Sequence, residues 1–128
     1  MFNFSNHVYL LVSNGIVKAT ELKSGAYTEM NLPSSSHPRT PMGSFKETEK
    51  AFTQILNKVS PKSVFKPAPV AYVHLINKVE GGYTDVELRA FKEAALGAGA
   101  REVYMPDSRV QLTKEQLLNK QFVQHPNA

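Results

Sequence analysis

The side chains whose types and spacing could perform catalysis or bind a metal in this chain are four histidines and a short run of serines. The histidines, at His7, His37, His74 and His125, have neither the HxH nor the HExxH spacing of a zinc site. The serines at 34–36 precede a histidine, but prolines flank them and no G-x-S-x-G turn presents a nucleophile. We therefore predict no catalytic residue and no metal site, and we interpret His74, within an apolar stretch, as a hydrogen-bonded core residue.

Phosphate chemistry also lacks its usual residues. The GAGA sequence at 97–100 follows a predicted helix, and the negative end of a helix dipole repels anions. The first predicted strand, at residues 7–12, has no acidic side chain, whereas a two-metal nuclease needs carboxylates on such a strand. The sequence thus predicts neither a phosphate loop nor a nuclease site.

Composition and charge restrict the class of protein. With 41% hydrophobic and 20% charged residues, the chain has the balance of a single globular domain, and without cysteine it has no disulfide or thiolate zinc site. The net charge of +4 permits attraction to nucleic acid, and its clearest cluster is Lys58, Lys62 and Lys66. Few aromatic side chains suited to base stacking are interleaved with these lysines, so we expect a solvated loop. A basic nucleic-acid-binding module is an alternative that the sequence does not favour.

Hydrophobic periodicity and turn residues predict the elements that would position any site. Strands at 7–12, 16–22 and 26–32 form an antiparallel meander, in which Asn14-Gly15 favours a type I′ turn. Capping boxes then begin three helices. The later elements are a helix from Ser44 that stops before Pro61, a strand at 70–76, a helix from Thr84 closed by Gly97 and Gly99, a strand at 102–105, and a helix at 114–122 that begins at Thr113.

The predicted order is β-β-β-α-β-α-β-α, and the fold class is α/β with a five-stranded mixed sheet. The strand at 70–76 is apolar on both faces, so we expect it in the middle of the sheet. This is the plan of a ribonuclease H-like or actin-like ATPase subdomain. We expect one domain over residues 1–122 and a flexible tail at 123–128. We also expect one core that contains Leu11, Ile55, Val73, Phe91, Ala95 and Val103.

Two stretches carry a resemblance to a known family. GYTDVELRAFKEAALGAGAREVYM, at residues 82–105, strongly resembles a segment of the bacterial actin homologue MreB, the rod shape-determining family. FKETEKAFTQILNKV, at 45–59, resembles the family's preceding helix. The resemblance runs loosely from the first strand to Tyr104 and covers one subdomain, the lobe called IA. It implies an actin-like fold and a role linked to cell shape or the cytoskeleton.

The resemblance also indicates what this chain lacks. Members of the family bind ATP through a first-strand motif resembling D-L-G-T, and the corresponding residues here, at 10–15, include no carboxylate. After the last strand the family has a carboxylate that positions water. Only Asp107 could stand in for it, and we interpret Asp107 as a turn residue. We therefore expect a non-catalytic, nucleotide-free protein without a cofactor. A residual nucleotide-binding or ATPase fragment is the alternative.

A subdomain of this kind is expected to act through protein association. The predicted C-terminal helix carries Leu117, Leu118 and Phe122, more apolar surface than a solvated terminal helix needs, so we interpret these residues as a candidate interaction surface. The partner would be a second copy of the chain or an actin-like cytoskeletal protein. Alternatively, the helix folds back on its own sheet. The N-terminus resembles neither a signal peptide nor a membrane span, so a cytoplasmic location is expected.

Overall fold

A computed structural model describes residues 6–13, 15–32, 45–61, 68–76 and 84–125 of the chain. Its elements follow the predicted order. They are β1 (His7–Ser13), β2 (Ile16–Glu21), β3 (Tyr27–Asn31), α1 (Phe45–Val59), β4 (Val70–Leu75), α2 (Asp85–Gly97), β5 (Glu102–Tyr104) and α3 (Lys114–Leu118). The predicted fold class, α/β with a five-stranded mixed sheet of the actin-like plan, is confirmed. No helix in these ranges is long and apolar enough to cross a membrane.

The strands form one sheet in the order β3-β2-β1-β4-β5. β1 pairs antiparallel with β2 and parallel with β4, and β4 pairs parallel with β5. All six residues of β4 are buried. A strand that is apolar on both faces is stable only where both faces are covered, so the predicted position of this strand inside the sheet is confirmed.

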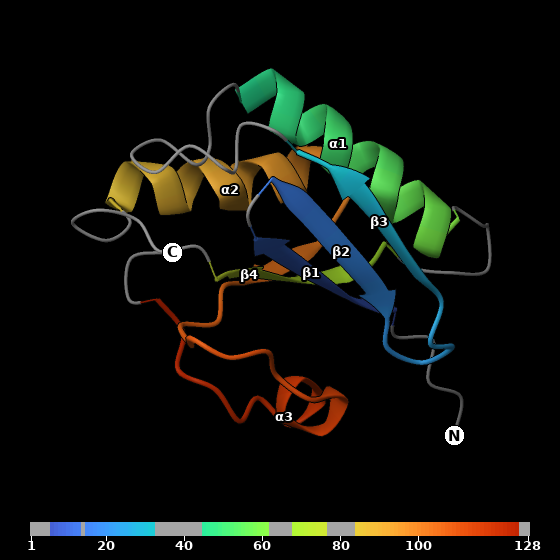
Figure 1. Cartoon of the computed structure of the whole chain (residues 1–128), viewed down its shortest axis with the longest axis vertical. Coiled ribbons are helices and arrows are strands. Elements are labelled where there is room, and N and C mark those ends of the chain that lie inside the picture. The colour runs from blue at the N-terminus through green and yellow to red at the C-terminus, as the bar shows by residue number, and fades with distance from the viewer. Residues whose placement is uncertain (1–5, 14, 33–44, 62–67, 77–83, 126–128) are drawn as a thin grey trace.

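The sheet has a different cover on each face. Figure 1 shows α1 and α2 on one side of the sheet and α3 on the other. The core beneath α1 and α2 contains most of the residues predicted to share one, among them Ile55, Val73, Phe91, Ala95 and Val103.

The prediction of a single core is wrong for Leu11. This residue belongs to a second cluster, which also contains Tyr9, Tyr72 and Leu117. Successive side chains of a strand point to opposite faces, so Leu10 packs in the core beneath the two long helices while Leu11 packs on the other side. The sheet therefore separates two clusters.

Local capping signals set the starts of α2 and α3. Thr84 and Thr113 each form the predicted capping box, with Glu87 and Gln116 as the respective partners. In each box the threonine oxygen accepts from the partner's backbone N–H, and the partner's side chain accepts from the backbone N–H of the threonine. Gly99 has a φ of +114°, the positive value expected just after a helix end.

The helix α3 is shorter than predicted, because it ends at Leu118 and not at Phe122. Lys120 has a φ of +55°, in the left-handed region, and a residue in this conformation cannot continue a right-handed helix. The N–H of Gln121 then bonds back to the carbonyl of Gln116 at 2.7 Å. Apolar residues continue beyond Leu118, so hydrophobic periodicity alone predicts a longer helix.

Three residues of the predicted tail are hydrogen-bonded in the structure. Pro106 and Gln124 form an antiparallel bridge. The N–H of Asp107 donates to the carbonyl of Val123 at 2.6 Å. The short strand β5 leaves backbone groups available just beyond its end, and residues 123–125 pair with them.

Some predicted features fall outside the described residues. They are Asn14 of the first turn, Ser44 at the start of α1, the serines and histidine within 33–44, and the last three residues of the tail.

Candidate functional site

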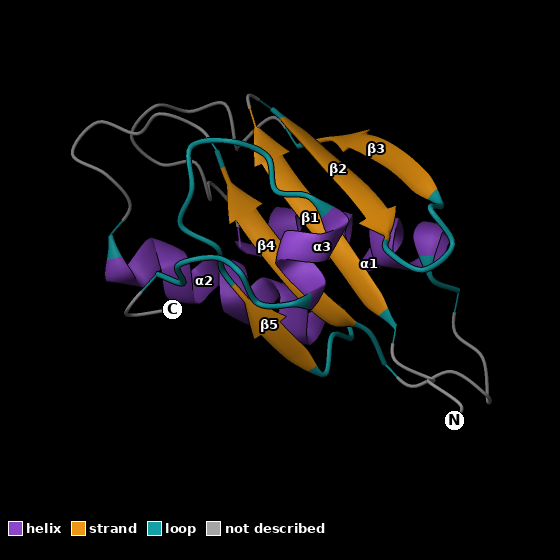
Figure 2. Ribbon diagram, turned by 90° about the horizontal axis from the view of Figure 1, so that it is seen from below, coloured by secondary structure: helices purple, strands orange, loops and turns teal. Residues whose placement is uncertain are grey.

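The C-terminal segment, meaning residues 106–125, covers the face of the sheet opposite α1 and α2. Figure 2 shows α3 lying across this face, over β1 and β4. Leu112 and Leu117 are both buried and pack in the second cluster with Tyr9 and Leu22. The segment thereby removes from solvent an apolar face that β1 and β4 would otherwise expose.

A buried chain of hydrogen bonds attaches the start of this segment to the sheet. His74 of β4 is fully buried, and its Nε2 lies 2.8 Å from the carbonyl oxygen of Ser108, so Nε2 carries a proton. Nδ1 then accepts from the hydroxyl of Tyr9 at 2.5 Å. The N–H of Leu112 donates to that hydroxyl oxygen at 3.1 Å. The prediction that His74 is a hydrogen-bonded core residue is confirmed.

Burial keeps both ionisable side chains of this chain of hydrogen bonds neutral. Burial lowers the pKa of His74 and raises the pKa of Tyr9, so both side chains are neutral near pH 7. The imidazole nitrogens and the hydroxyl all have partners within the chain. The pair therefore attaches the C-terminal segment to the sheet.

A second group of contacts attaches the far end of the segment. The Nζ of Lys120 donates to the hydroxyl oxygen of Tyr72 at 2.7 Å. It lies 4.8 Å from the ring centroid of Tyr72 and 4.4 Å from that of Tyr104. Phe122 meets these two rings edge-on, at interplanar angles of 89° and 76°. The lysine is thus tied to β4 by the hydrogen bond to Tyr72 and to β5 by the attraction between its charge and the ring of Tyr104.

His7 extends this group onto β1. Its ring stacks on Tyr72 with the centroids 5.9 Å apart, and its Nδ1 lies 3.1 Å from the Tyr72 hydroxyl. Since Lys120 donates to that hydroxyl oxygen, the hydroxyl proton is left to donate to His7. Burial, and then the nearby Lys120 ammonium, lower the pKa of His7. Burial also raises the pKa of Tyr72 to about 12 and lowers the pKa of Lys120.

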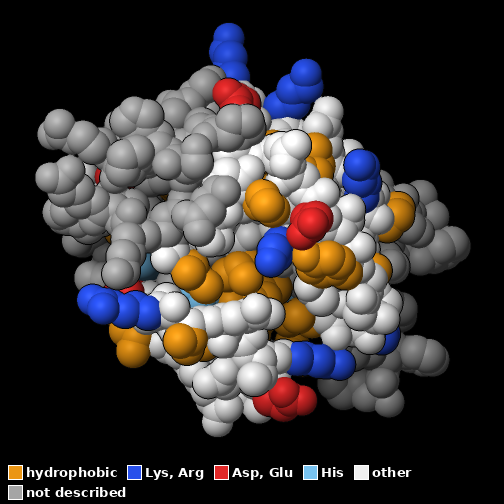
Figure 3. All heavy atoms as spheres, viewed as in Figure 1, with side chains coloured by type: hydrophobic (Ala, Val, Ile, Leu, Met, Phe, Trp, Pro, Cys, Tyr) orange, Lys and Arg blue, Asp and Glu red, His pale blue; other side chains and the backbone are white. Residues whose placement is uncertain are grey.

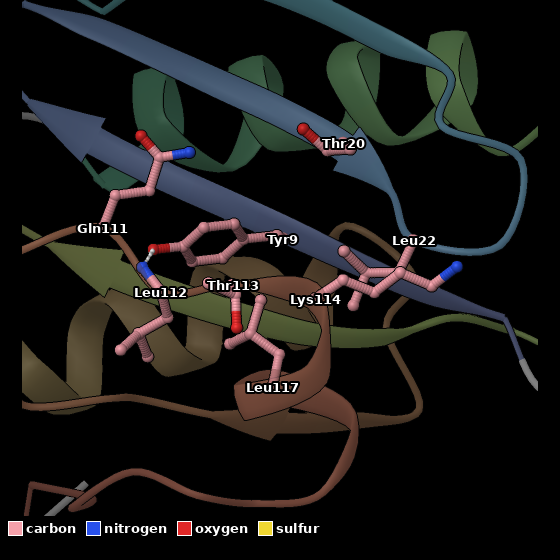
Figure 4. A pocket seen from close by; sticks show the side chains of 8 residues that line it. All are labelled: Tyr9, Thr20, Leu22, Gln111, Leu112, Thr113, Lys114 and Leu117. Atoms are coloured by element: carbon pink, nitrogen blue, oxygen red, sulfur yellow. Dashed lines mark hydrogen bonds between the residues drawn. The ribbon is translucent and has the colours of Figure 1, made fainter.

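A pocket of about 370 Å³ lies between β1, β2 and α3. Figure 4 shows Tyr9 at its centre, with the hydroxyl bonded to the N–H of Leu112. It is lined by Tyr9, Thr20, Leu22, Gln111, Leu112, Thr113, Lys114 and Leu117. Figure 3 shows apolar side chains gathered in the middle of this view, between the sheet and α3. The lining includes no carboxylate, the side chain that most often holds the magnesium of a nucleotide complex.

The three residues of the predicted interaction surface have different environments. Leu117 is fully buried inside the chain's own second cluster, so it is not available to a partner. Leu118 is 39% exposed. Phe122 is partly buried against Tyr72 and Tyr104. The structure thus has the alternative arrangement, in which the helix folds back on its own sheet.

The other predicted candidates lie apart from this face or on its margin. Lys58 is exposed near the end of α1, while Lys62 and Lys66 lie outside the described residues. Asp107 is 56% exposed, and its Oδ2 is 3.8 Å from Nδ1 of His125. Within the described ranges, no three histidine or acidic side chains come together as metal ligands would.

The sequence did not predict the group formed by Tyr72, Tyr104 and Lys120. One signal was available, because Tyr72 and His74 are alternate residues of a strand that otherwise reads as core, which marks one of its faces as polar. Tyr72 and Tyr104 are direct partners in neighbouring parallel strands. That pairing and the position of Lys120 depend on contacts between distant segments.

The similarity to MreB is confirmed over part of the chain. A segment of 58 residues, 45% of this chain, is 43% identical to the cell shape-determining protein MreB of Pasteurella multocida and of Haemophilus influenzae. Over the same length it is 41% identical to MreB of Escherichia coli. The matched segment covers 15% to 16% of the length of these relatives. No protein-family model matches the chain.

Proposed function

We propose that this protein is a nucleotide-free, non-catalytic module of actin-like fold that acts through protein association, in a role linked to cell shape. The observation that carries the proposal is the packing of the C-terminal segment on the sheet. By the resemblance to the MreB family, the face of this lobe that meets the nucleotide phosphates is covered by the rest of the molecule, and here the C-terminal segment covers one face of the sheet, with Leu112 and Leu117 buried beneath it. A nucleotide on this face would have to displace the segment or fit within the pocket of about 370 Å³ beside it.

The composition of that face supports the same proposal. The described residues of β1 include no carboxylate, and no acidic side chain lines the neighbouring pocket. Without a carboxylate to organise magnesium, a triphosphate in this pocket would have Lys114 as the one charged side chain of the lining. A residual nucleotide-binding fragment is the alternative.

The partner that we propose is an actin-like cytoskeletal protein. It would bind to the outer face of α2 of this chain. This helix lies within the stretch that resembles MreB, and its outer residues Val86, Arg89 and Glu93 are exposed, Val86 at 78%. A chain that reproduces one surface of a filament subunit can bind where that subunit's neighbours bind. A homodimer through α3 has less support, because Leu117 is already buried within the chain.

Calorimetry tests the nucleotide half of the proposal. Titration of the whole chain with ATP and magnesium should release no saturable heat. Saturable binding of ATP with a micromolar dissociation constant would instead favour the residual ATPase fragment.

Co-sedimentation with filaments of the Pasteurella multocida relative tests the association half. The whole chain should pellet with the filaments, and the Val86→Asp and Arg89→Glu variants should lose at least half of the bound fraction. Lys18→Glu, a charge change on the exposed side of β2, is the matched control and should bind normally. Equal binding by all variants would exclude α2 as the contact.

A further inference from the structure

The pocket beside α3 has an apolar floor. Tyr9, Leu22, Leu112 and Leu117 supply this floor, and each of these residues is at most 8% exposed. The volume of about 370 Å³ is near the lower end of the range for ligand sites, which runs from about 300 to 1,000 Å³. The floor therefore suits the apolar body of a small molecule.

The rim of the pocket is polar and carries one charge. Its polar residues are Thr20, Gln111, Thr113 and Lys114. Figure 4 shows the side chain of Lys114 extending toward Leu22, while Gln111 lies beyond the other end of the Tyr9 ring. Among the described residues, no carboxylate lies within salt-bridge distance of the Lys114 ammonium. This ammonium can therefore pair with a bound anion.

Two other polar groups of the lining already have partners within the chain. The hydroxyl of Tyr9 lies between Nδ1 of His74 and the N–H of Leu112. The Oγ1 of Thr113 accepts from the N–H of Gln116 at 3.2 Å. A bound anion thus has one charged partner, and one ammonium compensates a single negative charge. A carboxylate carries such a charge, whereas a phosphate monoester carries about 1.5 to 2 negative charges at neutral pH.

We propose that this pocket binds a small amphipathic monocarboxylate, whose apolar body lies on Tyr9 and the leucines and whose carboxylate pairs with Lys114. The floor and the ammonium come from different parts of the chain, because Tyr9 and Leu22 belong to the sheet region whereas Lys114 begins α3. A ligand of this kind would contact both at once. The proposal is independent of the association function above, since it concerns a different surface from the outer face of α2.

The test titrates the whole chain with 3-phenylpropionate at neutral pH, while NMR follows the backbone N–H groups of Leu112 and Thr113. Saturable shifts with a dissociation constant of about 0.3–3 mM are expected, as befits so small a ligand. The neutral analogue 3-phenyl-1-propanol should bind at least about threefold more weakly, because it gains no ion pair. The cationic analogue 3-phenylpropylamine should bind at least about tenfold more weakly, because Lys114 repels it.

Three variants locate the site. Lys114→Met should weaken binding of 3-phenylpropionate about threefold to fivefold, the size expected for one exposed ion pair. Lys58→Met, which removes an exposed lysine of α1 on the other side of the sheet, is the matched control and should bind normally. Thr20→Trp should abolish binding, because its indole would fill the pocket, and circular dichroism checks that this variant is folded.

Three results would overturn the proposal. The first is the absence of saturable shifts in the wild-type chain. The second is equal binding of the carboxylate and its two analogues, which would show that the charge is not recognised. The third is equal affinity of the Lys114→Met and Lys58→Met variants, which would place the anion elsewhere on the surface.

Discussion

The two faces of the sheet are buried by different kinds of contact. Beneath α1 and α2, the core consists of aliphatic side chains and the tilted pair of Phe52 and Phe91, whose ring centroids are 6.4 Å apart. Beneath the C-terminal segment, the apolar cluster has fewer residues, and hydrogen bonds of His74 and Lys120 add to it. A pocket lies beside this cluster. Apolar burial is non-directional, whereas hydrogen bonds require particular atoms. The first face therefore supplies most of the stability, and the second depends on individual side chains.

The largest effect should come from the helix-covered face. We predict that Phe52→Ala lowers the free energy of unfolding by about 3–5 kcal/mol, because the fully buried ring leaves a cavity that the packed helices cannot fill. Urea denaturation monitored by circular dichroism measures this loss. A loss below about 1 kcal/mol would mean that this face is not the main core.

A smaller loss is expected on the other face. Leu117→Ala should cost about 2–3 kcal/mol, since the side chain is fully buried but borders a pocket into which its neighbours and water can move. The same urea experiment applies. Leu118→Ala, at a residue that is 39% exposed, is the control and should change stability by less than about 1 kcal/mol. Equal losses for the two variants would contradict the orientation of α3.

Acidification should weaken the second face through its histidines. Burial lowers the pKa of His74 and of His7 below the ordinary value of 6.5. The unfolded chain therefore binds protons before the folded chain does, and the free energy of unfolding should fall as the pH drops below 6.5. Urea denaturation between pH 7.5 and 5 measures the slope.

The variant His74→Gln separates this contribution from the rest of the chain. Its amide keeps a donor for the carbonyl of Ser108 but does not titrate, so the dependence on pH should become shallower. An unchanged slope would show that His74 does not carry the effect.

The smallest effect is expected where the two long helices meet. A Cβ built on Gly97 of α2 would lie 2.0 Å from Oε2 of Glu49 on α1. This atom is the mobile end of a side chain and can move, and alanine favours a helix over glycine by about 1 kcal/mol. Gly97→Ala should therefore change the thermal midpoint by no more than about 5 °C. A larger loss would show that the carboxylate of Glu49 cannot move away.

Much of the architecture could be predicted from local sequence. The capping boxes at Thr84 and Thr113 and the positive φ of Gly99 involve residues within a few positions of one another. The strand order follows from a meander and a right-handed crossover, which sterics and chain connectivity constrain. The similarity to MreB can also be detected from the sequence, because the matching residues lie in continuous stretches of the chain.

The candidate site could be predicted only in part. His74 was recognised as a core histidine because its neighbours in the strand are apolar. Its partners Tyr9 and Ser108 were not, since they lie 65 and 34 positions away along the chain. The end of α3 does not follow from the sequence, because the positive φ of Lys120 has no counterpart in the apolar pattern.

The sequence by itself determined the helices, the strands and their order, because caps, turns and periodicity act between residues close along the chain. Only the tertiary structure decided that Leu11 belongs to a separate cluster, and that Lys120 contacts Tyr72, 48 positions earlier. Contacts over such separations depend on the summed packing of whole elements on the two faces of the sheet. No short pattern of residues encodes that sum, so the cover of the second face is visible only in the folded chain.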